Sequence, residues 1–439
     1  MTTSVLDREP MTDTPAAPTR LLSAGPAAPG QEAAWNQFTK LPPPTRTDER
    51  WRFANVKDLD LGAYLPPLPF DGAVREDLLT RSRGVEKSAG RMVFANDQLL
   101  TREVFADALS RIGVIWLPLE RAMTEHPDLF QQYFMREEAI LGGQKFAALH
   151  ASQVRTGTFL FVPRGVEIDL PIEAFHWLHG DNGSCFPHTL IVAQERAKVT
   201  FVDYYESADA NAPGLACAVN DLWLGAGASV TYVCAQNWSR QALAFQMNAT
   251  VVGRDAWARS LFAQVGSRHL RTESVSHLRA PGGRSDMLAL TVADDAQEVD
   301  ARTFQIHEAP NTASDLLYKN SLDDSARTIF SGLIRVDPGA QQTDAYQKVR
   351  NLLLSDEAEA NSAPGLEIKA DNVRCTHGAT SGQIEQEELF YLMSRGISKR
   401  AAQKLIVHGF LQEVIDRLEA PAIGKKLAEM VQAKFAAHA

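Results

Sequence analysis

The feature that most constrains the fold is a succession of short runs rich in β-branched and aromatic residues, beginning near Thr156. Gly, Asp, Asn or Pro separates each run from the next, and no strong helical periodicity intervenes. A chain of this kind is mainly β, and its irregularly spaced turns suit either a β-solenoid or a large β-sandwich. The runs are Thr158–Val162, Thr189–Ala193, Lys198–Tyr204, Ser229–Ala235, Asn248–Gly253, Arg259–Val265, Asp286–Val292 and Thr328–Val336.

The segments on either side of this β-rich core differ from it in composition. Residues 1–30 are rich in Pro, Ala and Thr and contain few large apolar groups, which predicts a flexible tail. Residues 31–150 carry a mixed pattern that predicts an N-terminal region of helices with some strand. The β core is expected over residues 151–380, and a helical segment over residues 381–439.

One helix of the C-terminal segment carries a clear apolar face. Leu411, Val414, Ile415 and Leu418 fall at i, i+3, i+4 and i+7 before Pro421 ends the pattern. This face has two interpretations, which can hold together. It can cap the last rung of a repeat array, or it can be a docking surface for a partner subunit.

Composition excludes several classes of function. The 44 Lys and Arg against 54 Asp and Glu give a net charge of −10, which disfavours binding to nucleic acid or to an anionic membrane. No apolar run approaches the roughly 20 residues that span a bilayer, so the cytoplasm is the expected location. No GxxxxGK[ST] motif occurs, so any nucleotide energy must come from a partner.

A potential metal-ligand pair lies in the sequence Cys375-Thr376-His377-Gly378. Side chains two residues apart in an extended segment project to the same side, so the thiol and the imidazole are expected to lie together. Both groups suit Fe²⁺ or Zn²⁺, yet two ligands leave the coordination sphere incomplete. Either a partner completes the site or the pair is structural.

The other candidate sites are weaker. The four cysteines, Cys185, Cys217, Cys234 and Cys375, form no CxxC pair, which argues against a self-contained cluster or zinc site and against a disulfide framework. The spacing of His176, His179, Cys185 and His188 permits zinc but also suits a packed turn. The acidic pairs Asp294-Asp295 and Asp323-Asp324 can bind a cation or simply be solvated turns.

Residues 364–396 resemble the C-terminal region of the SufB/SufD family of iron–sulfur cluster assembly proteins. The resemblance rests on Leu366-Glu367-Ile368, on Cys375, on His377-Gly378-Ala379-Thr380 and on Leu389–Gly396. The run from Arg46 to Phe53 is similar to an early segment of SufD-like members. The resemblance implies a right-handed parallel β-helix core, which decides between the two β architectures, and C-terminal helices that grip the ATPase SufC.

Departures from the SufB pattern point toward SufD-like members. The segment matching the strand that carries the SufB cysteine is Val349–Leu354, and it holds no thiol; Gly378 replaces a SufB glutamate. The resemblance therefore implies a non-catalytic scaffold subunit that contributes His377 to a nascent iron–sulfur cluster at the SufB interface. Cys375 is either an auxiliary ligand or a structural thiol, and reduced flavin is a possible cofactor of the complex.

Two alternatives remain open from the residues. A SufB-type scaffold would hold the cluster itself, which the missing upstream cysteine opposes. A β-helix enzyme acting on carbohydrate would need paired Asp or Glu side chains on adjacent rungs, with carboxyl groups roughly 5 to 10 Å apart.

Overall fold

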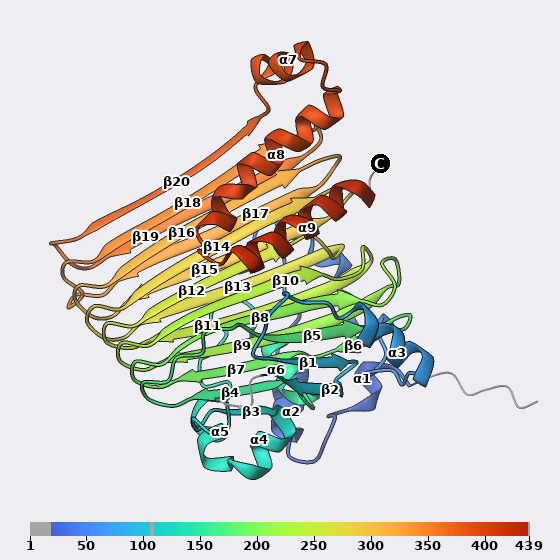
Figure 1. Cartoon of the computed structure of the whole chain (residues 1–439), viewed down its shortest axis with the longest axis vertical. Helices are drawn as coiled ribbons and strands as arrows, with labels where there is room; N and C mark the ends of the chain where they lie inside the picture. Colours follow the sequence, from blue (N-terminus) through green and yellow to red (C-terminus); the bar gives the residue numbers. More distant parts are fainter. Residues whose placement is uncertain (1–18, 106–108, 438–439) are drawn as a thin grey trace, which may run out of the picture.

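The computed structural model describes residues 19–105 and 109–437, and its body is a parallel β-helix (Figure 1). The mainly β fold predicted from the sequence is confirmed, with an N-terminal α/β region and C-terminal helices. Within the described residues, the helices are too short or too polar to cross a bilayer.

The β-helix is built from consecutive strands, which are short at its N-terminal end and 8 to 11 residues long from β8 onward. Its strands are β4 (Thr158–Val162), β5 (Ile172–Leu178), β6 (Gly183–Cys185), β7 (His188–Ala193), β8 (Lys198–Ser207), β9 (Gly214–Leu224), β10 (Ser229–Asn237), β11 (Ala242–Val252), β12 (Trp257–Gln264), β13 (His269–Leu278), β14 (Arg284–Ala293), β15 (Glu298–His307), β16 (Ala313–Leu322), β17 (Arg327–Val336), β18 (Asp344–Leu353), β19 (Glu359–Ile368) and β20 (Arg374–Gln383).

The remaining elements lie before and after these strands. The N-terminal region contains α1 (Leu21–Ala24), α2 (Glu32–Lys40), the 3₁₀ turns η1 (Glu49–Trp51), η2 (Val56–Asp58) and η3 (Leu61–Ala63), α3 (Gly72–Arg81), β1 (Gly90–Ala95), β2 (Gln98–Val104), β3 (Ile115–Pro118), α4 (Leu119–Glu125), α5 (Pro127–Tyr133) and α6 (Gln144–Gln153). The C-terminal region contains α7 (Gln386–Ser394), α8 (Lys399–Asp416) and α9 (Pro421–Ala437).

The strands alternate between two sheets. Sheet A has the order β2-β1-β5-β8-β10-β12-β14-β16-β18-β20, and sheet B has the order β19-β17-β15-β13-β11-β9-β7-β4-β3. Parallel neighbours cannot be joined by a short hairpin, and here the crossover that each pair needs is a strand of the other sheet. Successive rungs from β8 to β20 stack without a register shift, as in Asp344↔Arg374.

Left-handed residues turn the corners of the rungs. Asp255, Asp295 and Asp324 have φ of 53°, 50° and 49°, a conformation that Asp and Asn tolerate better than other non-glycine residues. This requirement explains why Asp, Asn and Gly separate the β-rich runs in the sequence. Within a strand, residues alternate between the interior and the outer face: Phe201 packs in the interior cluster and Val202 in the cluster on the outer face of sheet A.

The two ends of the β-helix are different. At the N-terminal end, the hairpin β1–β2 and the antiparallel strand β3 close the two sheets. At the C-terminal end, β20 and β19 are the last strands of sheets A and B, so each has one edge without a strand partner among the described residues. Edges of this kind can pair with another chain.

The helices α8 and α9 lie across the outer face of sheet A (Figure 1). Leu411, Val414, Ile415 and Leu418 are buried there, in one cluster with outward-facing side chains of sheet A such as Leu261. This corrects the interpretation of these four residues as a docking surface, because the chain's own sheet occupies the face. The outer face of sheet A is apolar along several strands and needs a cover.

The predicted tail is described only in part. Residues 1–18 lie outside the described residues. From residue 19 onward the segment packs on the body rather than extending freely: Leu21 is buried, and the Ala27 N–H donates to the carbonyl of Ser152 at 2.9 Å.

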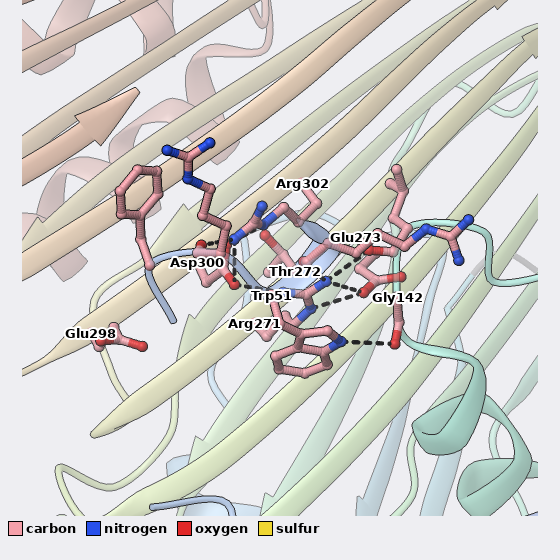
Figure 2. Close-up of polar contacts among 12 residues, drawn as sticks. Trp51, Gly142, Arg271, Thr272, Glu273, Glu298, Asp300 and Arg302 are labelled. Carbon is pink, nitrogen blue, oxygen red and sulfur yellow. Dashed lines mark hydrogen bonds and ion pairs between the residues drawn. The ribbon is translucent and has the colours of Figure 1, made fainter. Parts of the chain in front are cut away.

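A ladder of three arginines joins the N-terminal region to the outer face of sheet B, and Figure 2 shows two of them, Arg271 and Arg302. Arg271 on β13 donates to the Arg50 carbonyl at 3.0 Å, and Arg302 on β15 donates to the Arg52 carbonyl at 2.8 Å. Arg327 on β17 donates to the Phe53 carbonyl. Because the three strands are consecutive in sheet B, the segment runs across the rungs and is tied to each of them.

Arg271 is the most enclosed member of the ladder. Its guanidinium lies 3.7 Å from the ring centroid of Trp51 and forms ion pairs with Glu273 and Asp300 (Figure 2). All three charged groups are buried, so the carboxylates need charge compensation. Arg271 supplies it to both of them, and Arg302 also pairs with Asp300.

We expect Arg271→Ala to lower the free energy of unfolding by about 3–5 kcal/mol, because it leaves two buried carboxylates with less compensation. The matched control is Arg374→Ala, which removes an arginine that is 84% exposed in its pair with Asp344 and should cost about 1 kcal/mol or less. Urea unfolding of the two variants measures both values. Equal losses of unfolding free energy would mean that the buried ion pairs of Arg271 stabilise the fold no more than an exposed pair does.

Candidate functional site

Cys375 and His377 lie on β20, the last strand of sheet A. The register places Cys375 beside Ala345 and His377 beside Gln347 of β18. Ala345 and Gln347 are buried inside the β-helix, so the thiol and the imidazole both face the interior at the open end. The sequence expectation that the two side chains share one side agrees with this register.

The surroundings of the pair are exposed because no further rung covers them. Leu366 and Ile368 of β19 occupy interior-facing positions, yet both are exposed to solvent. His377 is exposed, and Cys375 is half-buried against Ala345 and its neighbours. The open end is therefore an interior without a further rung over it among the described residues, and a thiol and an imidazole lie at its surface.

The protonation state of Cys375 limits its chemistry. Partial burial is the main reason that the pKa of this thiol lies above its ordinary value, and the carboxylate of Asp344 adds to the effect. The thiolate is the form that binds metals, so Cys375 needs a metal or a cationic partner before it can act as a ligand. His377 forms no hydrogen bond or ion pair with the residues that the structure describes.

The described residues contain no group of three or more His, Cys, Asp or Glu arranged to hold a metal ion. Cys375 and His377 thus supply two donors, whereas a tetrahedral site needs four. Another molecule must fill the remaining positions if a metal binds here.

The histidines and cysteine of the predicted zinc spacing are not brought together. His176 stacks on Phe94 at 5.0 Å between ring centroids and lies 3.3 Å from Asp203. His188 instead contacts His150, with 3.0 Å between ring nitrogens. The arrangement is that of packed interior side chains.

The remaining candidates also have structural roles. Asp294 forms ion pairs with Arg240 and Lys434, and the backbone N–H of Asp295 donates to the carboxylate of Asp324 on the next rung. Cys185, Cys217 and Cys234 are buried, and burial raises the pKa of each thiol. The acidic residues thus stabilise the corners of the rungs, and the three cysteines pack in the core.

One pair of carboxylates does lie on adjacent rungs, as a glycosidase-like site would require. Asp286 of β14 and Asp315 of β16 are register partners on the outer face of sheet A. Asp286 is paired with Arg259 and Arg284, and Asp315 is paired with Arg417. These arginines neutralise the pair, which leaves neither carboxylate as a free acid or base.

Beneath His377 lies a buried polar chain that sequence reasoning missed. Gln347 is fully buried, and its Nε2 lies 3.5 Å from Gln305 Oε1. Gln305 Nε2 donates to Ser314 Oγ at 2.7 Å, and Ser314 Oγ lies 2.8 Å from His307 Nε2. In the sequence, the signal for these hydrogen bonds is the presence of polar residues at inward positions of predicted strands.

A second exposed surface lies on the helices that follow β20. Phe390, Tyr391 and Met393 of α7 and Leu405 of α8 are exposed, with Phe390 at 73%. In Figure 1, α7 lies beyond β20, at the open end. Both this surface and the predicted docking face lie in the C-terminal helical segment. The apolar periodicity in the sequence identified the face that is buried, and it did not identify the surface that is exposed.

The comparisons with known proteins all find similarity to one protein family. The family model described as "SUF system FeS cluster assembly, SufBD core domain" matches residues 176–410, and that of the "SufBD protein N-terminal region" matches residues 28–174. The iron-sulfur cluster assembly protein SufD of Bacillus subtilis is 29% identical over 351 residues, 80% of each chain. SufB of the same organism is 27% identical over 300 residues, 68% of this chain and 64% of that protein.

The polar chain predicts a pH dependence of stability. Burial lowers the pKa of His307 from 6.5 to about 4, so the folded protein keeps this imidazole neutral where the unfolded chain protonates it. The resulting stability is present above pH 6.5 and is lost as the pH falls toward 4. His307→Gln should therefore lose less stability than the wild type between pH 7 and pH 5, measured by urea unfolding. An equal loss would mean that His307 does not contribute.

Proposed function

Because the chain belongs to the SufB/SufD family of iron–sulfur cluster assembly proteins, we propose that it is a SufD-type scaffold subunit working with SufB and the ATPase SufC. The observation that carries the proposal is the open end of the β-helix, where Cys375 and His377 face the interior and supply two of the ligands that a metal site needs. The nascent iron–sulfur cluster is the cargo of this site.

In this proposal, SufB covers the open end. The free edges of β19 and β20 offer backbone donors and acceptors to the strands of a partner, which is a common mode of protein association. The exposed Leu366 and Ile368 would be buried in the same contact. His377 then contributes its imidazole from one side, and SufB supplies the missing ligands.

The SufD-type assignment is supported by the residues of β18 that lie next to Cys375 and His377. The interior-facing residues of β18 are Ala345, Gln347, Val349, Asn351 and Leu353, and none of them is a thiol. A SufB-type scaffold would need its own cysteine there, so this alternative is less well supported. A carbohydrate-active enzyme is not supported either, because arginines neutralise the Asp286 and Asp315 pair.

We further propose that SufC binds the exposed apolar surface of Phe390, Tyr391, Met393 and Leu405. This chain contains no phosphate-binding motif of the Walker type, so the ATPase activity belongs to SufC and the present chain is non-catalytic. Reduced flavin remains an expectation for the complex, and it is assigned to no residue of this chain.

His377→Ala should leave assembly with SufB and SufC intact while the purified complex loses its iron and sulfide, because the change removes a ligand without adding charge. Iron and sulfide content at matched subunit stoichiometry measures the effect. Cys375→Ser is the comparison variant, and its loss should be smaller because the raised pKa of the thiol leaves less of the metal-binding thiolate available. Unchanged iron and sulfide in His377→Ala would reject the site.

Phe390→Asp should weaken SufC binding by tenfold or more, because it places an unpaired charge in an apolar contact at a cost of several kcal/mol. It should not change the free energy of unfolding of the isolated chain, since Phe390 is exposed. Leu411→Asp is the opposite control: it should destabilise the chain, because Leu411 is buried against sheet A. Titration calorimetry and urea unfolding separate the two effects. Wild-type affinity in Phe390→Asp would exclude this surface.

A further inference from the structure

The buried polar chain beneath His377 has a direction that one backbone group determines. Thr312 donates its hydroxyl hydrogen to the carbonyl of Ala309 at 3.0 Å, and a carbonyl can only accept. Thr343 Oγ1, 3.3 Å from Thr312 Oγ1, donates in the same way to the carbonyl of Ala340. With its hydrogen on the Ala309 carbonyl, Thr312 Oγ1 is assigned as the acceptor of His307 Nδ1, which lies 2.7 Å away. Neutral His307 carries its single proton on Nδ1, so its Nε2 accepts from the Ser314 hydroxyl at 2.8 Å.

The direction continues to the next rung. Because the Ser314 hydrogen is used on His307, Ser314 Oγ accepts from Gln305 Nε2 at 2.7 Å. That orients the Gln305 amide and turns its Oε1 toward Gln347 Nε2, 3.5 Å away. Gln347 Nε2 also lies 3.4 Å from Thr303 Oγ1, so the nitrogen end of the Gln347 amide is engaged.

The oxygen end of the same amide is left without a partner. Gln347 is fully buried, and its Oε1 accepts no hydrogen bond within the part of the chain that the structure describes. A buried acceptor that stays unpaired costs roughly 1–3 kcal/mol. The surrounding fold nevertheless makes room for this amide: a Cβ at Gly332 would lie 2.1 Å from Gln347 Nε2, so glycine is required opposite it.

The imidazole of His377 is the donor placed to satisfy this oxygen. His377 is the register partner of Gln347 on the next strand, and paired positions of parallel neighbours stand about 4.8 Å apart. Both side chains face the interior, and His377 forms no hydrogen bond with the residues that the structure describes. Neighbouring positions at this spacing place the imidazole and the amide within side-chain reach of each other.

We infer that Gln347 is a positioning residue for His377: its Oε1 accepts from one ring nitrogen and so fixes the tautomer that turns the other nitrogen's lone pair toward the open end. The inference rests on the proposed function of His377 as a ligand. A hydrogen bond of this kind is how proteins commonly orient a ligating histidine. It gives the exposed imidazole a defined orientation before SufB or iron arrives.

The tautomer of His377 can be observed directly. In the full-length chain labelled with ¹⁵N-histidine, above pH 8, we expect His377 to show a single tautomer, with its signal assigned by its absence from His377→Ala. Gln347→Met, which keeps the shape but lacks the amide oxygen, should populate both tautomers. Gln347→Glu, which restores an oxygen acceptor, should return to one. Mixed tautomers in the wild type would overturn the inference even if a variant failed to fold.

The same variants test the link to iron. In the complex with SufB and SufC, Gln347→Met should hold iron about tenfold more weakly than the wild type, and Gln347→Glu should recover most of the difference. Wild-type iron binding in Gln347→Met, with a loss in His377→Ala, would overturn the positioning role and leave the proposed function intact. Wild-type iron binding in His377→Ala would overturn the proposed function, whatever the tautomer measurement gives.

Discussion

The in-register hydrogen bonding between parallel rungs is the constraint on which the rest of this structure depends. From β8 to β20, every strand repeats the position of the strand one rung before it. Side chains at equivalent positions therefore form columns about 4.8 Å apart. The apolar outer face of sheet A is built from such columns, whereas the arginine ladder on sheet B and the polar chain beneath His377 link side chains of different columns.

The same constraint explains why function gathers at one end. A stack of rungs has two terminal faces, and here an antiparallel hairpin closes the first of them. The second face ends in β19 and β20, so the column that contains Gln347 continues to His377 and then stops. Side chains that the next rung would cover inside the stack are available to another molecule at its end.

Much of the fold was accessible from the sequence, but the pairing was not. Strands β4 and β7 follow from their β-branched residues, whereas β13 and β15 carry Arg, Glu and Asp at outward positions and escape that pattern. The period of two placed Cys375 and His377 on one side. Their neighbour Gln347 depends on register, which a local pattern does not contain. Amphipathicity located Leu411 on a helical face without revealing that sheet A covers it.

The arginine ladder has a consequence for how this chain can diverge. Its three arginines donate to the main-chain carbonyls of Arg50, Arg52 and Phe53, groups that every amino acid possesses. The path of the segment is thus encoded in sheet B, and its own side chains are released from that task, except for the buried Trp51. The exposed residues of this segment can therefore be substituted during evolution while its backbone keeps the same path over the rungs.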